Sequence, residues 1–148
     1  MKNKQINWNS VSKNDLESDF SFFLNFYNFD IKQHTVNLQL KDIQSYGVQI
    51  ETKTTSEIKK SKYCQLNNHI IYYSNPSSGD VKELIRHFKN LVSHPQNVKK
   101  TTINNVLYYR LYDINKAISK ESMKGVVEVK IWKSFAMKLI ADINNHLK

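Results

Sequence analysis

Hydrophobic residues recur at helical spacing in the first part of the chain. From Lys13 to about Phe29 they lie three or four positions apart, which predicts an amphipathic helix. Ser12, with Asp15 three positions later, is typical of a helix start. We therefore expect the first helix to begin just after Ser12.

The pattern between Asp30 and Tyr73 allows more than one interpretation. From Asp30 to about Ile58, one helical stripe is formed by Val36, Leu40, Ile43, Gly47 and Ile50. This stripe favours a second helix, although Leu38 between Val36 and Leu40 also fits a short strand. The apolar and aromatic segment from Leu66 to Tyr73 is interpreted as a buried helix, with a strand as the alternative.

A further helix is expected after the loop from Asn75 to Gly79. Asp80 and Glu83 fit a capping box at its start. Pro95 disfavours helical geometry at the residue before it, so this helix should end at about Ser93.

The pattern of residues in the last third of the chain predicts a β-hairpin or an irregular excursion, followed by a helix. Tyr108–Ile114 and Val126–Ile131 are rich in aromatic and β-branched residues, with Asn115–Gly125 between them. Hydrophobic residues from Trp132 to Leu147 mark a terminal helix. The pattern as a whole predicts a mainly α fold, a helical bundle with at most a small β-hairpin between the last two helices. We expect one domain over residues 1–148.

Composition narrows the possible partners and location. The 148-residue chain has a formal net charge of +9, which favours polyanions such as RNA. Its single cysteine, Cys64, excludes an intrachain disulfide and a multi-cysteine metal site, and it fits a reducing cytoplasm. The sequence shows neither a signal peptide nor the run of about 20 apolar residues that spans a bilayer, so we expect a soluble cytoplasmic protein without membrane contact.

The helix from Asp80 to Ser93 has an apolar and a polar face. The apolar arc comprises Val81, Leu84, Ile85, Phe88, Leu91 and Val92. The opposite stripe comprises Glu83, Arg86, Asn90 and His94, at spacings that place side chains above one another. We expect the arc to be buried and the stripe accessible, with Lys89 on its flank and His87 at the edge of the core.

The polar stripe combines groups suited to phosphate chemistry. His94 can move protons near neutral pH, and Arg86 or Lys89 can bind a phosphate and stabilise its charge. Asn90 can orient the histidine or bind a phosphate oxygen. With RNA, such a set could activate the ribose 2′-hydroxyl without a metal, although Glu83 and Arg86 also fit a simple ion pair.

No other residues point to chemistry as clearly. The sequence contains no metal-ligand spacing and no phosphate-binding glycine loop, so we expect neither a metal nor a cofactor. His34, His69 and His146 are isolated, and we assign them no role.

The pattern Lys89-Asn90-x-x-x-His94 resembles the signature of the HEPN (higher eukaryotes and prokaryotes nucleotide-binding) superfamily. That signature has an arginine, usually a polar residue such as asparagine, a short spacer and a histidine. His94 matches the histidine, Asn90 the polar residue, and Lys89 occupies the arginine position. The resemblance extends from Asp80 to the C-terminus, including the segment around Tyr112 and the final helix.

The resemblance implies an all-α bundle in a homodimer, with two motif copies facing a shared cleft near His94. It also implies a metal-independent endoribonuclease of a toxin–antitoxin or phage-defence system. His94 would be the general acid or base, Lys89 or Arg86 would bind the phosphate, and Asn90 would orient. Because lysine lacks the planar fork of arginine, an alternative stays open: an inactive module that binds RNA or a protein partner such as an antitoxin.

Overall fold

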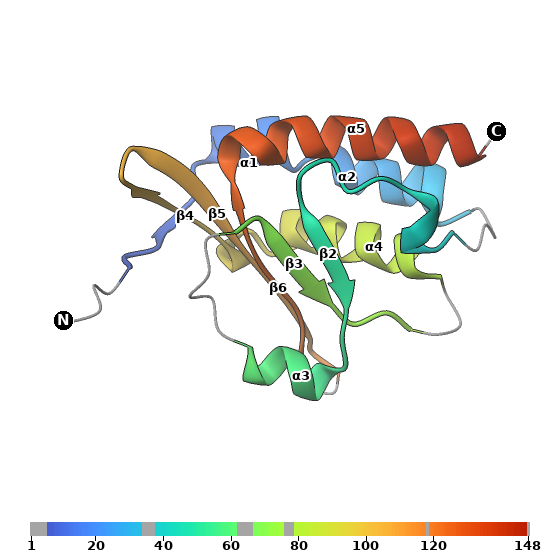
Figure 1. Ribbon diagram of the computed structural model, residues 1–148, viewed down its shortest axis with the longest axis horizontal. Helices are drawn as coiled ribbons and strands as arrows, with labels where there is room; N and C mark the ends of the chain where they lie inside the picture. The colour runs from blue at the N-terminus through green and yellow to red at the C-terminus, as the bar shows by residue number, and fades with distance from the viewer. Residues whose placement is uncertain (1–5, 34–37, 62–66, 76–78, 118, 148) are drawn as a thin grey trace.

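The computed structural model describes residues 6–33, 38–61, 67–75, 79–117 and 119–147 of the chain (Figure 1). Its elements follow in the order β1 (Asn9–Ser10), α1 (Lys13–Asp19), α2 (Phe22–Asn25), a π-helix (Phe26–Ile31), a 3₁₀ helix (Leu40–Asp42), β2 (Gln49–Thr52), α3 (Thr55–Lys60), β3 (His69–Tyr72), α4 (Asp80–Ser93), a second 3₁₀ helix (Pro95–Asn97), β4 (Val98–Ile103), β5 (Val106–Asn115), β6 (Lys120–Glu128) and α5 (Val129–Leu147).

The strands form one six-stranded mixed sheet in the order β1-β4-β5-β6-β3-β2. Strands β4, β5 and β6 form an antiparallel meander, and β3 pairs antiparallel with β6. Strand β2 pairs parallel with β3, which requires a crossover connection, and α3 lies within that connection. The fold is therefore α+β, and the predicted mainly α helical bundle is wrong.

The helix predicted from Asp30 to Ile58 is not what the described residues form. They contain the 3₁₀ helix Leu40–Asp42, then β2, and helix only at α3. Tyr46 and Gly47 have φ values of +49° and +91°, so the backbone turns in the middle of the expected helical stripe. Val36, which carried part of the strand alternative, lies outside the described residues.

The buried helix predicted from Leu66 to Tyr73 is also wrong, because His69–Tyr72 forms strand β3. Ile70 and Tyr72 belong to the main hydrophobic core, whereas Ile71 is buried outside it, on the side of the sheet that α3 contacts. A strand buried on both faces has a continuous apolar run and no alternation, so periodicity does not separate it from a buried helix.

The predicted β-hairpin corresponds to part of a larger meander. Strand β6 starts at Lys120, so the connecting turn is shorter than the expected Asn115–Gly125 segment, and Val129–Ile131 belongs to α5. Strand β4 was not predicted. It joins β5 through Asn104 and Asn105, whose φ values of +50° and +66° fit a two-residue type I′ turn.

The start of the first helix and the presence of the last helix agree with the sequence predictions. Helix α1 begins after Ser12, whose Oγ accepts a hydrogen bond from the backbone N–H of Asp15 at 3.1 Å. The first predicted helix is interrupted at Phe20 and Ser21 and then continues through α2 and the π-helix to Ile31. Helix α5 confirms the predicted terminal helix.

In the described part of the chain, no helix combines the length and apolarity needed to cross a bilayer.

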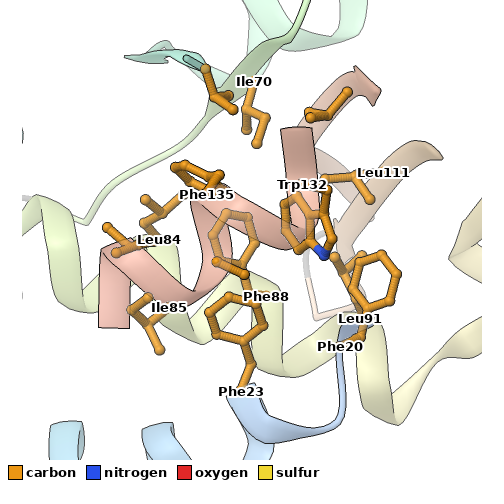
Figure 2. Packing of buried hydrophobic residues seen from close by; sticks show 14 of the residues in the cluster. Phe20, Phe23, Ile70, Leu84, Ile85, Phe88, Leu91, Leu111, Trp132 and Phe135 are labelled. Atoms are coloured by element: carbon orange, nitrogen blue, oxygen red, sulfur yellow. The ribbon is translucent and has the colours of Figure 1, made fainter. Parts of the chain in front are cut away.

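Helices α4 and α5 pack on one face of the sheet, and α1 and α2 pack against these two helices (Figure 1). Figure 2 shows aromatic side chains filling the space between the helices and the sheet. Trp132 of α5 stacks on Phe20 with ring centroids 5.0 Å apart and meets Phe88 of α4 edge-on at 5.1 Å. This packing fixes the position of α4 against the sheet.

Candidate functional site

Helix α4 supplies one wall of the candidate site. Its apolar arc is buried as predicted, apart from a half-buried Val92. The helix ends at Ser93, as predicted from Pro95, and His94 lies outside helical geometry at φ −130° and ψ 70°. Its start differs from the expectation, because Gly79 at φ +83° occupies the cap position and no side chain caps the helix. Asp80 is thus the first helical residue.

Three residues of the predicted polar stripe line one pocket of about 250 Å³, which we call the α4 pocket. It lies between α4, the end of β5 and the start of β6. Its lining residues are Arg86, Asn90, His94, Asp113, Ile114, Asn115, Lys116 and Ser122. The structure therefore brings Arg86, Asn90 and His94 together, and it adds groups that the sequence pattern did not identify.

Glu83, the fourth member of the stripe, is buried, so its predicted accessibility is wrong. Its Oε1 accepts a hydrogen bond from the backbone N–H of Asn75 at 3.1 Å, and its Oε2 accepts one from Arg86 Nε at 2.6 Å. Burial alone would lower the pKa of Arg86, but the hydrogen bond and charge of Glu83 raise it above its usual value. Glu83 thus holds a charged guanidinium at the pocket wall.

Lys89 lies outside the α4 pocket. Its Nζ sits 5.2 Å from the centroid of the Tyr27 ring, in the geometry of a cation–π contact. Burial, together with the nearby charge of Arg86, lowers the pKa of Lys89. The residue at the arginine position of the HEPN-like pattern is therefore not brought together with His94.

The sequence pattern missed a buried charged network behind the α4 pocket. His87 is fully buried and not at the edge of the core as expected. Its Nδ1 lies 2.7 Å from Asp113 Oδ2, and its Nε2 lies 2.9 Å from the backbone oxygen of Tyr73. Because both ring nitrogens face oxygen acceptors, the arrangement suits the doubly protonated ring, in which both nitrogens donate.

Asp113 completes the network from strand β5. Its Oδ2 also accepts a hydrogen bond from Asn90 Nδ2 at 3.0 Å, and its Oδ1 accepts one from the backbone N–H of Ile114 at 3.0 Å. Burial would raise the pKa of Asp113, but the hydrogen bonds from His87 and Asn90 outweigh it and lower the pKa. The carboxylate is therefore ionised and already occupied by donors.

His94 differs from His87 in that its ring is available to a ligand. The side chain is half-buried at the pocket wall. Among the residues that the structure describes, none forms a hydrogen bond with its ring. His94 can thus exchange protons with a bound group, whereas His87 cannot be reached.

The lining of the α4 pocket favours an anion. Arg86, His94 and Lys116 can each supply positive charge, and two asparagine amides and the Ser122 hydroxyl can donate hydrogen bonds. The carboxylate of Asp113 is already hydrogen-bonded to the His87 ring and to the Asn90 amide. The described residues contain no group of three or more histidine, cysteine, aspartate or glutamate side chains able to hold a metal ion.

No family model, curated protein or solved structure matches this chain. The HEPN resemblance therefore rests on the sequence from Asp80 to the C-terminus, and chiefly on the short pattern from Lys89 to His94. The all-α bundle that it implies is not the fold of this chain.

Proposed function

We propose that this protein binds RNA and that the α4 pocket holds one of its phosphate groups. The observation that carries this proposal is the convergence of Arg86 and His94 from α4 with Lys116 from the β5–β6 turn on one pocket. Pairing with Glu83 fixes Arg86 through its Nε, which leaves the two terminal nitrogens of the guanidinium for a ligand. The net charge of +9 favours the same class of partner.

The size of the α4 pocket agrees with this occupant. Pockets that enclose drug-sized ligands have volumes of about 300–1,000 Å³. At about 250 Å³, the α4 pocket suits a phosphate with part of the attached ribose better than a whole nucleoside. The rest of an RNA chain would lie on the surrounding surface. Binding of this kind is compatible with the predicted cytoplasmic location.

The test is RNA binding by a Lys116→Ala variant. Lys116 is exposed, so its loss should not disturb folding. We expect a several-fold lower affinity for single-stranded RNA at low salt. The slope of log affinity against log salt should fall by about 0.7–1, as expected when one phosphate contact is lost. Affinity is measured by fluorescence anisotropy over a salt series.

Lys130→Ala is the matched control. Lys130 is also exposed but lies on α5, outside the α4 pocket, and its replacement removes the same charge. We expect Lys130→Ala to change affinity much less than Lys116→Ala. Equal losses for the two variants would mean that the binding follows net charge and does not involve the α4 pocket.

A second candidate function is metal-independent RNA cleavage at the same pocket. The observation that favours it is the ring of His94, which lines the pocket beside Arg86 and has no hydrogen-bond partner among the described residues. His94 would take the proton of a ribose 2′-hydroxyl, whose oxygen then bonds to the adjacent phosphorus. The bond from phosphorus to the 5′-oxygen breaks, and that oxygen takes a proton from Lys116 or water. The products are a 2′,3′-cyclic phosphate and a 5′-hydroxyl end.

Cleavage is tested on gels with EDTA present. If it occurs, we expect His94→Ala to slow it about 10²- to 10⁴-fold while RNA binding persists. His146→Ala, at the exposed end of α5, is the control that should leave cleavage unchanged. Lys89→Arg should also have no effect, because Lys89 contacts Tyr27 and not the pocket. Intact RNA in the presence of binding would favour the inactive RNA-binding module.

The other expectations from the HEPN resemblance remain predictions. These are the homodimer with an interface near His94 and a protein partner such as an antitoxin.

A further inference from the structure

A second pocket lies on the other face of the sheet from α4. It has a volume of about 400 Å³ and is formed between α3 and the β5–β6 hairpin. We call it the α3 pocket; its lining residues are Thr55, Ser56, Lys59, Tyr112, Ile114, Ser119, Lys120 and Glu121. Figure 1 shows α3 on the far side of the sheet from α5.

The two pockets meet at the end of the β5–β6 hairpin. Neighbouring side chains of a strand point to opposite faces, so Tyr112 lines the α3 pocket and Asp113 lines the α4 pocket. Ile114, at an irregularity in the strand pairing, lines both. Lys116, in the turn after β5, lines the α4 pocket, whereas Lys120, the first residue of β6, lines the α3 pocket. A polyanion that crosses this turn would meet a cation in each pocket.

The chemistry of the α3 pocket differs from that of the α4 pocket. It combines one half-buried aromatic ring, Tyr112, with hydroxyl groups of Thr55 and Ser56 and the cations of Lys59 and Lys120. Its volume falls in the range of pockets that enclose a small organic molecule. A flat heterocycle can stack on the tyrosine ring while the hydroxyl groups bond to its polar edge.

The one carboxylate at this site is offset by a neighbouring lysine. Glu121 Oε2 lies 2.8 Å from Lys124 Nζ, close enough for an ion pair although the two atoms are not aligned as a hydrogen bond. Lys124 is itself held by the backbone oxygen of Ser61 at 2.8 Å. The negative charge of Glu121 therefore does not exclude an anionic ligand.

We propose that the α3 pocket binds one unpaired base of the same RNA strand that places a phosphate in the α4 pocket. This inference rests on the proposed function and adds to it the substrate class, namely single-stranded RNA that crosses the β5–β6 turn. A duplex is excluded from the α3 pocket, because its bases are stacked and paired and cannot enter a pocket.

The test compares an eight-nucleotide single-stranded RNA with the same sequence in a duplex. Tyr112→Leu removes the aromatic ring but keeps apolar bulk. It should lower the affinity for the single strand at least about fivefold, the low end of the loss when one base loses its stacking partner. It should leave the affinity for the duplex unchanged. Tyr112→Phe should bind the single strand as the wild type does.

Tyr108→Leu is the matched control. Tyr108 is on the same strand and the same face as Tyr112 and is also half-buried, but it does not line the α3 pocket. We expect it to leave the affinity for the single strand unchanged. Lys120→Ala, at an exposed position, is the second test and should weaken single-strand binding more than Lys130→Ala does, whatever the stability of Tyr112→Leu.

The outcomes separate the two proposals. If Lys116→Ala weakens binding but Tyr112→Leu and Lys120→Ala do not, the α3 pocket is not a base site and the proposed function still holds. If none of these variants differs from its control, both proposals fail. Equal losses for Tyr112→Leu and Tyr108→Leu, or equal losses for single strand and duplex, would also overturn the base site.

Discussion

Replacing Asp113 by alanine is expected to lower the free energy of unfolding by about 3–5 kcal/mol, the usual cost of breaking one side of a buried ion pair. The carboxylate is 3% exposed and accepts hydrogen bonds from His87, Asn90 and the backbone of Ile114. His87 is fully buried, and its other nitrogen already faces the backbone oxygen of Tyr73. Alanine would leave Nδ1 of the buried His87 ring without its hydrogen-bond partner.

Urea denaturation of three further variants defines the cause of this loss. Asp30→Ala removes an exposed carboxylate and should change the free energy of unfolding by no more than about 0.5 kcal/mol. His87→Ala and the double variant with Asp113→Ala complete a double-mutant cycle. We expect the double variant to cost clearly less than the sum of the two single variants, since they remove the same interaction. Additive costs would show that the two residues do not stabilise each other.

The same network should make the stability of the fold depend on pH in the acid range. Hydrogen bonds from His87 and Asn90 hold the pKa of Asp113 below its ordinary value, against the effect of burial. A carboxyl whose pKa is lower in the folded state stabilises the fold at pH values above its unfolded pKa of about 3.9. That contribution is lost as the pH falls through the lower, folded-state value. Asp113→Ala should therefore lose less stability than the wild type as the pH falls below about 4.

Periodicity identified the first helical segment, α4 and α5, but it gave two helices where the chain forms β2, α3 and β3. The arc from Val81 to Leu91 faces one core only, so its 3.6-residue spacing is clear in the sequence. Strand β3 is covered on both faces, and its apolar run has no period to read. The helical stripe up to Ile50 was a coincidence of spacing that included Gly47, a turn residue. The Asn104-Asn105 pair between β-branched segments was a local hairpin signal that could have revealed β4.

Part of the candidate site could be predicted from the sequence, because three of its residues lie on one helix with clear periodicity. Arg86, Asn90 and His94 share one helix face, and local geometry brings them together whatever the tertiary fold. The partners of these residues on β5 could not be predicted in this way. Their position depends on how segments far apart in the sequence pair and pack, and the spacing of residues within α4 carries no information about that. One signal was present: Asp113 falls on the face of β5 that also carries Tyr109 and Leu111, and a carboxylate on a buried face needs a partner.

Replacing Trp132 by alanine is expected to lower the free energy of unfolding by about 3–5 kcal/mol or more. The side chain is fully buried at the centre of the cluster in Figure 2. It contacts Phe20 and Phe23 from the first helices, Phe88 from α4 and Phe135 from its own helix. Domains of this size are usually stable by only about 5–15 kcal/mol, so the variant should be marginally folded. The measurement is the midpoint and slope of urea denaturation followed by circular dichroism.

Two variants separate the loss of packing from the loss of one hydrogen bond. Trp132 Nε1 donates to the backbone oxygen of Asp19 at 2.7 Å. Trp132→Phe keeps most of the aromatic contacts but loses this bond, so it should cost clearly less than Trp132→Ala. Met137→Ala, at a residue of α5 that is 65% exposed, should cost no more than about 0.5 kcal/mol.

Because Trp132 packs on Phe88, it also holds the helix that carries Arg86 and His94. Because phenylalanine keeps most of this packing, Trp132→Phe should retain the proposed RNA binding. A loss of that binding in a folded Trp132→Phe variant would show that the α4 pocket depends on more than the packing of α4.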